Sequence, residues 1–121
     1  MSQPFCYLEL HTQKFQSAKQ FYGKLFSWEL KEQQFGPLPY ISVAPGEGPI
    51  GGMVSSWYDK TNEQWVPYVL VDDVTKFAAK AKELGATIVS EKTEVPQTGF
   101  FILMRDPSGA PFALWERIAN K

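Results

Sequence analysis

Glu9 is the residue whose type and position carry the most chemistry in this sequence. Apolar and polar residues alternate from Phe5 to Leu10, with Tyr7 and Glu9 on the polar side, which is typical of a β-strand with two different faces. A buried carboxylate on such a strand must be paired, hydrated or protonated. Glu9 could therefore bind a cationic group, act as a general acid or base, or form an ion pair with Arg105. The residue types alone leave these alternatives open.

The sequence holds one histidine and one cysteine, and neither lies in a known catalytic or metal-binding motif. His11 lies near the end of its strand, so we expect a solvated histidine. Cys6 cannot form an internal disulfide, and we expect a small buried apolar side chain rather than a nucleophile. No phosphate-binding glycine loop, His–acid metal motif or serine elbow is present. The glycines between Gly48 and Gly52 are expected to be β-bulges at a bend of the sheet.

Two amphipathic helices are predicted from the spacing of apolar residues. One apolar stripe runs from Phe15 to Phe26, and the other runs from Val74 to Leu84. Asp73 lies where the N-cap of the second helix should be, and Gly85 lies where the chain should leave that helix. Each helix is preceded by one predicted strand and followed by three. The order strand, helix, strand, strand, strand therefore occurs twice, with matching elements about 58 to 61 residues apart.

This repeat predicts one domain made of two modules. The modules cover residues 1–56 and 65–117, and a polar connection without periodicity covers residues 57–64. Trp57 and Trp65 lie at the connection, where either could contribute to a dimer interface. A chain of 121 residues can bury about two thirds of its unfolded surface, so it needs no disulfide or metal to fold.

Composition narrows the classes of partner. The net charge of −1 argues against a nucleic-acid-binding protein, and no segment resembles a secretion signal or a membrane span, so we expect a cytoplasmic protein. Aromatic residues make up 15% of the chain, which is more than a small core usually needs. Some of them are expected to line a cavity or an interface.

The sequence resembles the vicinal oxygen chelate superfamily, which includes glyoxalase I, the extradiol dioxygenases and the bleomycin-resistance proteins. The residues that carry the resemblance are Ala18, Phe21-Tyr22 and Leu25-Phe26-Ser27-Trp28 in the first module, and Val71-Asp72, Leu84-Gly85-Ala86, Asp106-Pro107-Ser108-Gly109 and Phe112 in the second. The resemblance implies an α+β fold of two βαβββ modules that curl around a shared cavity, usually in a homodimer. It is nearest to small bacterial glyoxalase-like proteins.

Family members that use a metal carry His or Glu at four positions, on the first and last strand of each module. The corresponding residues here are Tyr7, Gly52, Val66 and Ala113. None of these is a histidine or an acid, whereas a divalent cation needs imidazole or carboxylate donors. We therefore expect no metal or other cofactor, unless the ligands are arranged in an atypical way.

If Tyr7 and Ala113 mark the cavity face, strand alternation assigns the other residues of the strands to one of two faces. The expected cavity face carries aromatic and polar side chains, namely Tyr7, Glu9, His11, Tyr68, Leu70 and Trp115. The expected helix-facing set is mostly aliphatic and consists of Cys6, Leu8, Leu10, Val69, Val71, Phe112 and Leu114. The cavity face either lines a pocket for an aromatic or cationic molecule, or fills the interior by packing on itself.

Three functions fit these expectations. The first is a metal-free protein that binds a small organic molecule through Tyr7, Glu9, His11, Tyr68, Arg105 and Trp115. The second is an enzyme, either a metal-free one that uses Glu9 as acid or base, or a glyoxalase-related lyase with an atypical metal site. The third is a structural or regulatory module without a ligand. The family resemblance supplies most of the support for the first.

Overall fold

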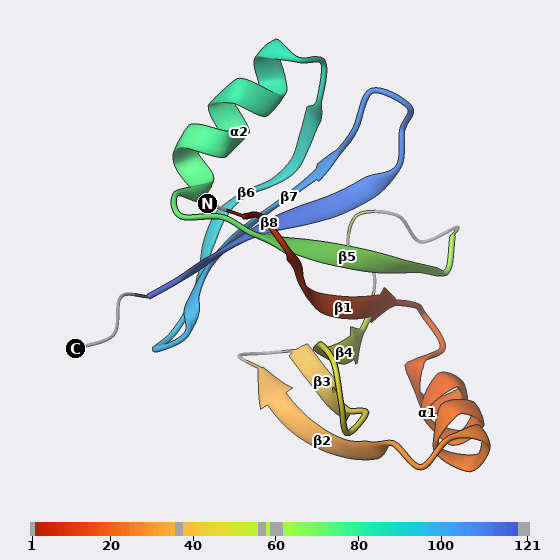
Figure 1. Cartoon of the computed structure of the whole chain (residues 1–121). Coiled ribbons are helices and arrows are strands. Elements are labelled where there is room, and N and C mark those ends of the chain that lie inside the picture. The colour runs from red at the N-terminus through yellow and green to blue at the C-terminus, as the bar shows by residue number, and fades with distance from the viewer. Residues whose placement is uncertain (1, 36–37, 56–57, 59–61, 119–121) are drawn as a thin grey trace. The chain divides into compact units, whose positions relative to one another are not determined.

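The computed structural model describes residues 2–35, 38–55, 58 and 62–118 (Figure 1). These residues form eight strands and two helices: β1 (Phe5–His11), α1 (Phe15–Leu25), β2 (Glu29–Phe35), β3 (Leu38–Ala44), β4 (Ile50–Val54), β5 (Gln64–Leu70), α2 (Val74–Glu83), β6 (Thr87–Val95), β7 (Gly99–Arg105) and β8 (Pro111–Arg117). Residues 57 and 59–61 of the expected connection at 57–64, and thus Trp57, lie outside the described residues. The observed order of elements is the predicted one.

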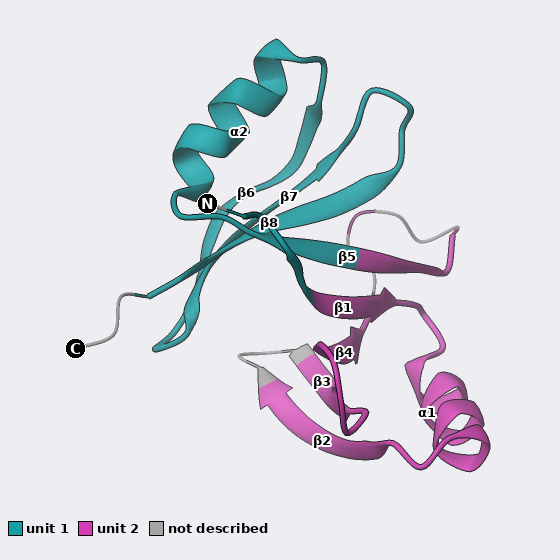
Figure 2. Ribbon diagram, viewed as in Figure 1, with its two compact units in different colours: residues 1–6, 67–121 teal, residues 7–66 magenta. Residues whose placement is uncertain are grey.

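The chain divides into two compact units (Figure 2). The N-terminal unit contains residues 7–66, and the C-terminal unit contains residues 1–6 and 67–121. The start of β1 belongs to the C-terminal unit, where the Leu70 N–H donates to the Pro4 carbonyl at 2.9 Å. The two units are described separately below.

Each unit contains the same four-stranded arrangement. The strand order is β2-β3-β4-β1 in the N-terminal unit and β6-β7-β8-β5 in the C-terminal unit. In each unit the first strand pairs in parallel with the last, and the remaining pairs are antiparallel. The registers also correspond, because the pair Ser42–Gly52 recurs as Leu103–Ala113, 61 residues further along in both strands. The prediction of two βαβββ modules in an α+β fold is confirmed.

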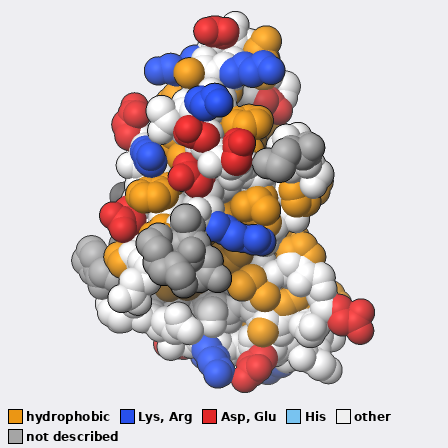
Figure 3. All heavy atoms as spheres, turned by 60° about the vertical axis from the view of Figure 1, so that its left-hand side comes forward, with side chains coloured by type: hydrophobic (Ala, Val, Ile, Leu, Met, Phe, Trp, Pro, Cys, Tyr) orange, Lys and Arg blue, Asp and Glu red, His pale blue; other side chains and the backbone are white. Residues whose placement is uncertain are grey.

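The surface carries charges of both signs. In the view of Figure 3, Lys and Arg side chains are interspersed with Asp and Glu side chains. This mixture agrees with the net charge of −1. The two helices of the described residues, of eleven and ten residues, are too short and too polar to cross a membrane.

An apolar cluster joins α1 to the sheet of the N-terminal unit. Its buried members are Leu10, Ile41, Val43 and Met53, which point from three neighbouring strands towards the helix. Phe15, Ala18 and Tyr22 of α1 pack against them, as the predicted apolar stripe requires. Burying such an aliphatic side chain contributes about 1.5–3 kcal/mol to folding. The opposite face of this sheet is therefore the one that carries the polar side chains of β1.

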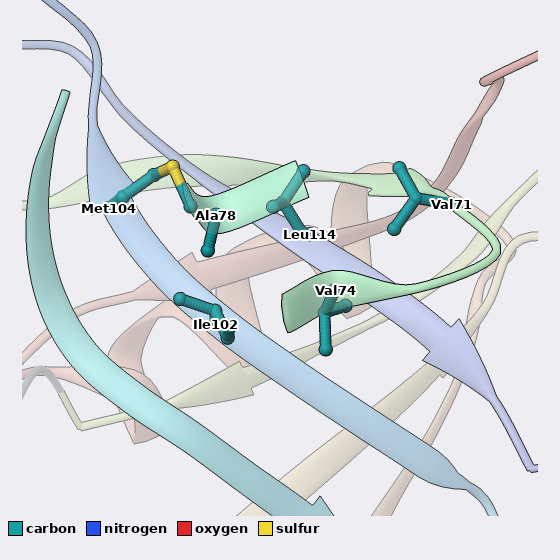
Figure 4. Packing of buried hydrophobic residues seen from close by; sticks show 6 residues of the cluster. All are labelled: Val71, Val74, Ala78, Ile102, Met104 and Leu114. Atoms are coloured by element: carbon teal, nitrogen blue, oxygen red, sulfur yellow. The ribbon is translucent and has the colours of Figure 1, made fainter. Parts of the chain in front are cut away.

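A second apolar cluster joins α2 to the sheet of the C-terminal unit (Figure 4). Its members are Val71, Val74, Ala78, Ile102, Met104 and Leu114. Val69 and Phe112 pack against it, so the predicted helix-facing side of β5 and β8 is confirmed. Leu8 of β1 also belongs to the expected helix-facing set, but 40% of its surface is exposed.

The ends of α2 follow from local hydrogen bonds. The Asp73 carboxylate accepts from the Lys76 N–H at 3.1 Å, and the Glu116 carboxylate accepts from the Val74 N–H at 3.0 Å. Gly85 follows the helix with φ +106°, a conformation that glycine adopts without strain. The predicted N-cap and C-terminal glycine are confirmed.

Two strands are longer than the sequence predicts, because the residue pattern indicates strands only at Trp28–Lys31 and Ala86–Val89. β2 extends to Phe35, and β6 extends to Val95 with irregular pairing to β7. Both strands carry runs of exposed polar residues, which show no alternation of apolar and polar positions. Backbone pairing with β3 and β7 keeps these segments extended, and a single-sequence pattern does not record that pairing.

Replacing Asp73 with Ala should lower the free energy of unfolding by about 0.5–2 kcal/mol, because the Lys76 N–H loses its acceptor. Asp72→Ala is the matched control, since it removes the same charge from the exposed neighbouring position, and it should change stability by less than about 0.5 kcal/mol. Urea unfolding of both variants measures the difference. Equal losses would show that charge, rather than the cap, is responsible.

Candidate functional site

A buried carboxylate–imidazole pair lies on β1. Glu9 and His11 are 7% and 0% exposed, and His11 Nε2 lies 2.7 Å from Glu9 Oε1. They are two residues apart on one strand, so their side chains lie on the same face, opposite Leu10 and α1. A carboxylate can only accept, so Nε2 carries the shared proton. The expectation of a solvated His11 is wrong, because strand pairing and its two side-chain partners enclose the ring.

Tyrosine hydroxyls extend this pair on both sides. The Tyr40 hydroxyl donates to Glu9 Oε2 at 2.7 Å. Since Tyr40 has only one proton to donate, its hydrogen bond with the Tyr7 hydroxyl must be donated by Tyr7. On the other side the Tyr58 hydroxyl lies 2.6 Å from His11 Nδ1, which accepts from it in the neutral imidazole. The five side chains form one hydrogen-bonded chain in which the donors lead towards Glu9. We call it the Glu9 network.

Gly52 makes room for this network. It pairs with Glu9 on one side and with Ser42 on the other, in a regular ladder rather than the expected bulge. A Cβ at Gly52 would overlap the hydroxyl and ring of Tyr40, so the Tyr40 ring passes directly over this glycine to reach Glu9. Gly51 is also required by close approach, since its Cβ would overlap the Leu8 carbonyl oxygen.

The surroundings keep the phenols of the network protonated. Burial, followed by the nearby Glu9 carboxylate, raises the pKa of Tyr7 and of Tyr40 well above the usual value for a phenol. A second negative charge beside Glu9 is unfavourable in a site that water barely reaches. Both hydroxyls therefore remain donors over the physiological pH range.

The equivalent positions of the C-terminal unit carry aromatic side chains. Tyr68 pairs with Ala113 as Glu9 pairs with Gly52, and Phe101 lies where Tyr40 does. The ring centroid of Tyr68 lies 6.1 Å from that of Phe101 and 6.4 Å from that of Trp115. These three rings pack together within their own unit. Of the predicted ligand-binding set, Tyr68 and Trp115 are thus brought together here.

The structure gives the other predicted residues separate surroundings. Arg105 Nη1 donates to the Gly109 carbonyl at 2.9 Å and so braces the turn between β7 and β8. Its pairing with Glu9 stays a prediction. Cys6 is half-buried, and burial raises the pKa of its thiol, which disfavours the nucleophilic thiolate.

Sequence reasoning missed two members of the network. Tyr40 is not among the candidate residues, although its alternation with Ile41 and Val43 puts it on the Glu9 face. Tyr58 lies in a polar segment without periodicity, and no pattern there indicates where a side chain points.

Two grooves among the described residues border α1. One of about 210 Å³ is lined by Phe15 of α1 and by residues of β2 and β3, including Tyr40 of the Glu9 network, and Glu32 in its lining contacts Lys19 of α1. Another of about 350 Å³ is lined by residues of α1 together with Trp28 and Leu30. Glu9 itself lines neither of these two grooves.

The residues present do not fit the metal site of the superfamily. Gly52, Val66 and Ala113 have no donor atom in their side chains, and the Tyr7 hydroxyl is engaged with Tyr40. Across residues 2–35, 38–55, 58 and 62–118, no group of three His, Cys, Asp or Glu side chains could hold an ion. The chemistry of Glu9 is therefore considered below without a metal.

Gly52→Ala should lower the free energy of unfolding by about 2–4 kcal/mol, because the new methyl group displaces Tyr40 from the Glu9 carboxylate. Gly23→Ala is the matched control, since its Cβ would meet only the tip of Leu30 at 3.4 Å, and in a helix it should stabilise by about 0.5–1 kcal/mol. Urea unfolding compares them. A loss below about 1 kcal/mol at Gly52 would contradict the close approach.

Tyr7 and Tyr40 should stay protonated when the folded protein is titrated from about pH 9 to 12, because the pKa of each phenol is raised. The unfolded chain loses these protons first, so the free energy of unfolding should fall as pH rises above about 10. Absorbance of tyrosinate at 295 nm follows the ionisation, with Tyr22→Phe as the matched control for Tyr40→Phe. Five phenols titrating together in folded protein would contradict this expectation.

The chain matches one known protein family and is similar to two named proteins. The model of the family described as glyoxalase-like domain matches residues 7–115. Over 75 residues, or 62% of the chain, the sequence is 31% identical to the proteins named "Putative glyoxylase CFP32" of Mycobacterium tuberculosis and Mycobacterium bovis. The match covers 29% of those relatives, so the chain spans under a third of their length.

Solved structures agree on the fold. The hypothetical protein BH1468 from Bacillus halodurans is 11% identical with a TM-score of 0.71, covering 100% of this chain and 99% of that one. The methylmalonyl-CoA epimerase of Mycobacterium tuberculosis is 14% identical with a TM-score of 0.68, covering 95% and 88%. At these identities the likeness shows the fold alone. Because the family model spans nearly the whole chain, and the fold is that of the superfamily the sequence resembles, the chain belongs to the glyoxalase-like domain family of the vicinal oxygen chelate superfamily.

Proposed function

We propose that this glyoxalase-like chain binds a small organic molecule without a metal, and that the Glu9 network is the polar anchor for that molecule. The observation that carries the proposal is the burial of Glu9 and His11 on the sheet face turned away from α1. An apolar side chain would fill such a position at lower cost, since a buried charge is expensive unless it is well paired.

The geometry of the network supports an anchor role. One oxygen of Glu9 accepts from His11 and the other accepts from Tyr40, and the phenols behind Tyr40 and His11 limit their movement. Held in this way, Glu9 presents negative charge in a fixed place before a ligand arrives. A cationic or N–H-bearing ring compound matches that charge.

An acid–base enzyme is the second candidate, and the 2.7 Å contact between His11 and Glu9 favours it. A carboxylate that shares a proton with an imidazole can accept a proton from a bound carbon acid and return it. Similar proteins carry the names putative glyoxylase and methylmalonyl-CoA epimerase, and the likeness to the epimerase shows the fold alone. Exchange of the methyl protons of acetophenone with D₂O, followed by NMR, would detect such a step. It should vanish in Glu9→Gln.

Glu9→Gln should weaken the binding of benzylamine at least tenfold, because it removes the charge that faces the ammonium group. Glu32→Gln is the matched control, since it makes the same change at an exposed carboxylate paired with Lys19, and it should leave binding unchanged. Ligand-observed NMR titration measures both, and a ligand-induced rise in melting temperature confirms binding to the native state.

Two results would contradict the proposal. One is an absence of binding by wild-type protein to any single-ring amine, amide or ketone at millimolar concentration. The other is unchanged binding in Glu9→Gln together with a loss of about 1–3 kcal/mol in stability, which would make Glu9 a paired structural carboxylate. Binding lost on chelation, together with metal found in the purified protein, would favour a lyase with an atypical metal site. The homodimer and the cytoplasmic location stay predictions.

A further inference from the structure

Gln64 carries a buried polar group that the fold does not use. It is the first residue of β5, and its Nε2 is inaccessible to solvent without a hydrogen-bond partner among the described residues. Buried side-chain N–H groups are nearly always paired, so an unpaired one requires an explanation.

The side chain of Gln64 lies on the same face as Glu9. Its neighbour Trp65 faces α1, because the indole Nε1 donates to the Tyr22 hydroxyl at 3.3 Å and the two ring centroids are 5.6 Å apart. Side chains alternate along a strand, so Gln64 lies on the face turned away from that helix. Glu9 and His11 occupy that face, opposite Leu10.

Gln64 also lies near the end of β1 that carries His11. The residue before it, Glu63, accepts from the Thr12 hydroxyl and, at 3.2 Å, from the Gln13 N–H. Thr12 directly follows His11 in the chain. The beginning of β5 is thereby held beside the end of β1, within the N-terminal unit. The unused amide and the Glu9 network share both a face and an end of the sheet.

We propose that Gln64 is a ligand-contacting residue whose side-chain N–H donates to an acceptor oxygen of the molecule bound at the Glu9 network. This inference rests on the proposed function and narrows the class of ligand. A molecule that satisfies both groups carries a donor or positive group for Glu9 and, on the same small framework, a carbonyl-type oxygen for Gln64. A carboxamide meets both requirements, a ketone only the second, and an amine only the first.

Three single-ring probes separate the two contacts. Benzylamine, acetophenone and benzamide are titrated by ligand-observed NMR into wild type, Gln64→Met and Glu9→Gln, each as the full chain. Methionine keeps the length and lack of branching of glutamine and removes the donor. Gln33→Met is the matched control, because it makes the same change at an exposed amide that already bonds Ser42.

Gln64→Met should weaken the binding of acetophenone and of benzamide at least tenfold and leave the binding of benzylamine unchanged. Glu9→Gln should weaken the binding of benzylamine and leave the binding of acetophenone unchanged. Without any probe, the melting temperature of Gln64→Met should equal or exceed that of wild type, because no protein hydrogen bond is lost.

Unchanged binding of acetophenone in Gln64→Met would overturn the role of Gln64 and leave the Glu9 anchor standing. A lower melting temperature in the ligand-free variant would also overturn it, by showing that the amide is bonded within the protein. Failure of all three probes to bind wild type would overturn the proposed function and, with it, this inference.

Discussion

The burial of the Glu9 carboxylate is the constraint on which the polar half of the N-terminal unit depends. A charge at 7% exposure needs hydrogen-bond donors aimed at it, and His11 and Tyr40 supply them. Tyr40 reaches Glu9 only because Gly52 has no side chain. The identities of these residues, on three neighbouring strands, thus follow from one buried group.

The two modules share one backbone arrangement but carry different side chains on one face of the sheet. Their strands have the same order and corresponding registers, and in each the helix packs on an apolar cluster on one face of the sheet. These clusters maintain the fold, so the opposite face is free to vary. It carries a hydrogen-bonded carboxylate in the N-terminal unit and the rings of Tyr68, Phe101 and Trp115 in the C-terminal unit. Fold and site chemistry are therefore separable in this chain.

The superfamily's metal positions fall into equivalent pairs in this structure. Gly52 and Ala113 occupy corresponding places in the registers of β4 and β8, and Tyr7 and Val66 correspond on β1 and β5. The side chains of glycine and alanine at the first pair offer no donor atom to a metal. At Gly52 the ring of Tyr40 fills the space that a side chain would occupy. The Tyr40 hydroxyl and the His11 imidazole thus donate to the Glu9 carboxylate on this face.

The sequence by itself determined the elements, their duplication and the two faces of β1, β5 and β8, because alternation and helical spacing are local consequences of backbone geometry. It also determined the caps of α2 at Asp73 and Gly85, and the absence of a histidine or an acid at the four ligand positions. Only the tertiary structure decided that His11 is enclosed and that Tyr40 and Tyr58 join it. The contact between Tyr40 and Glu9 spans 31 residues of sequence, and the contact between Tyr58 and His11 spans 47. The strand register and the path of the loops bring these residues together, and no local sequence pattern encodes either.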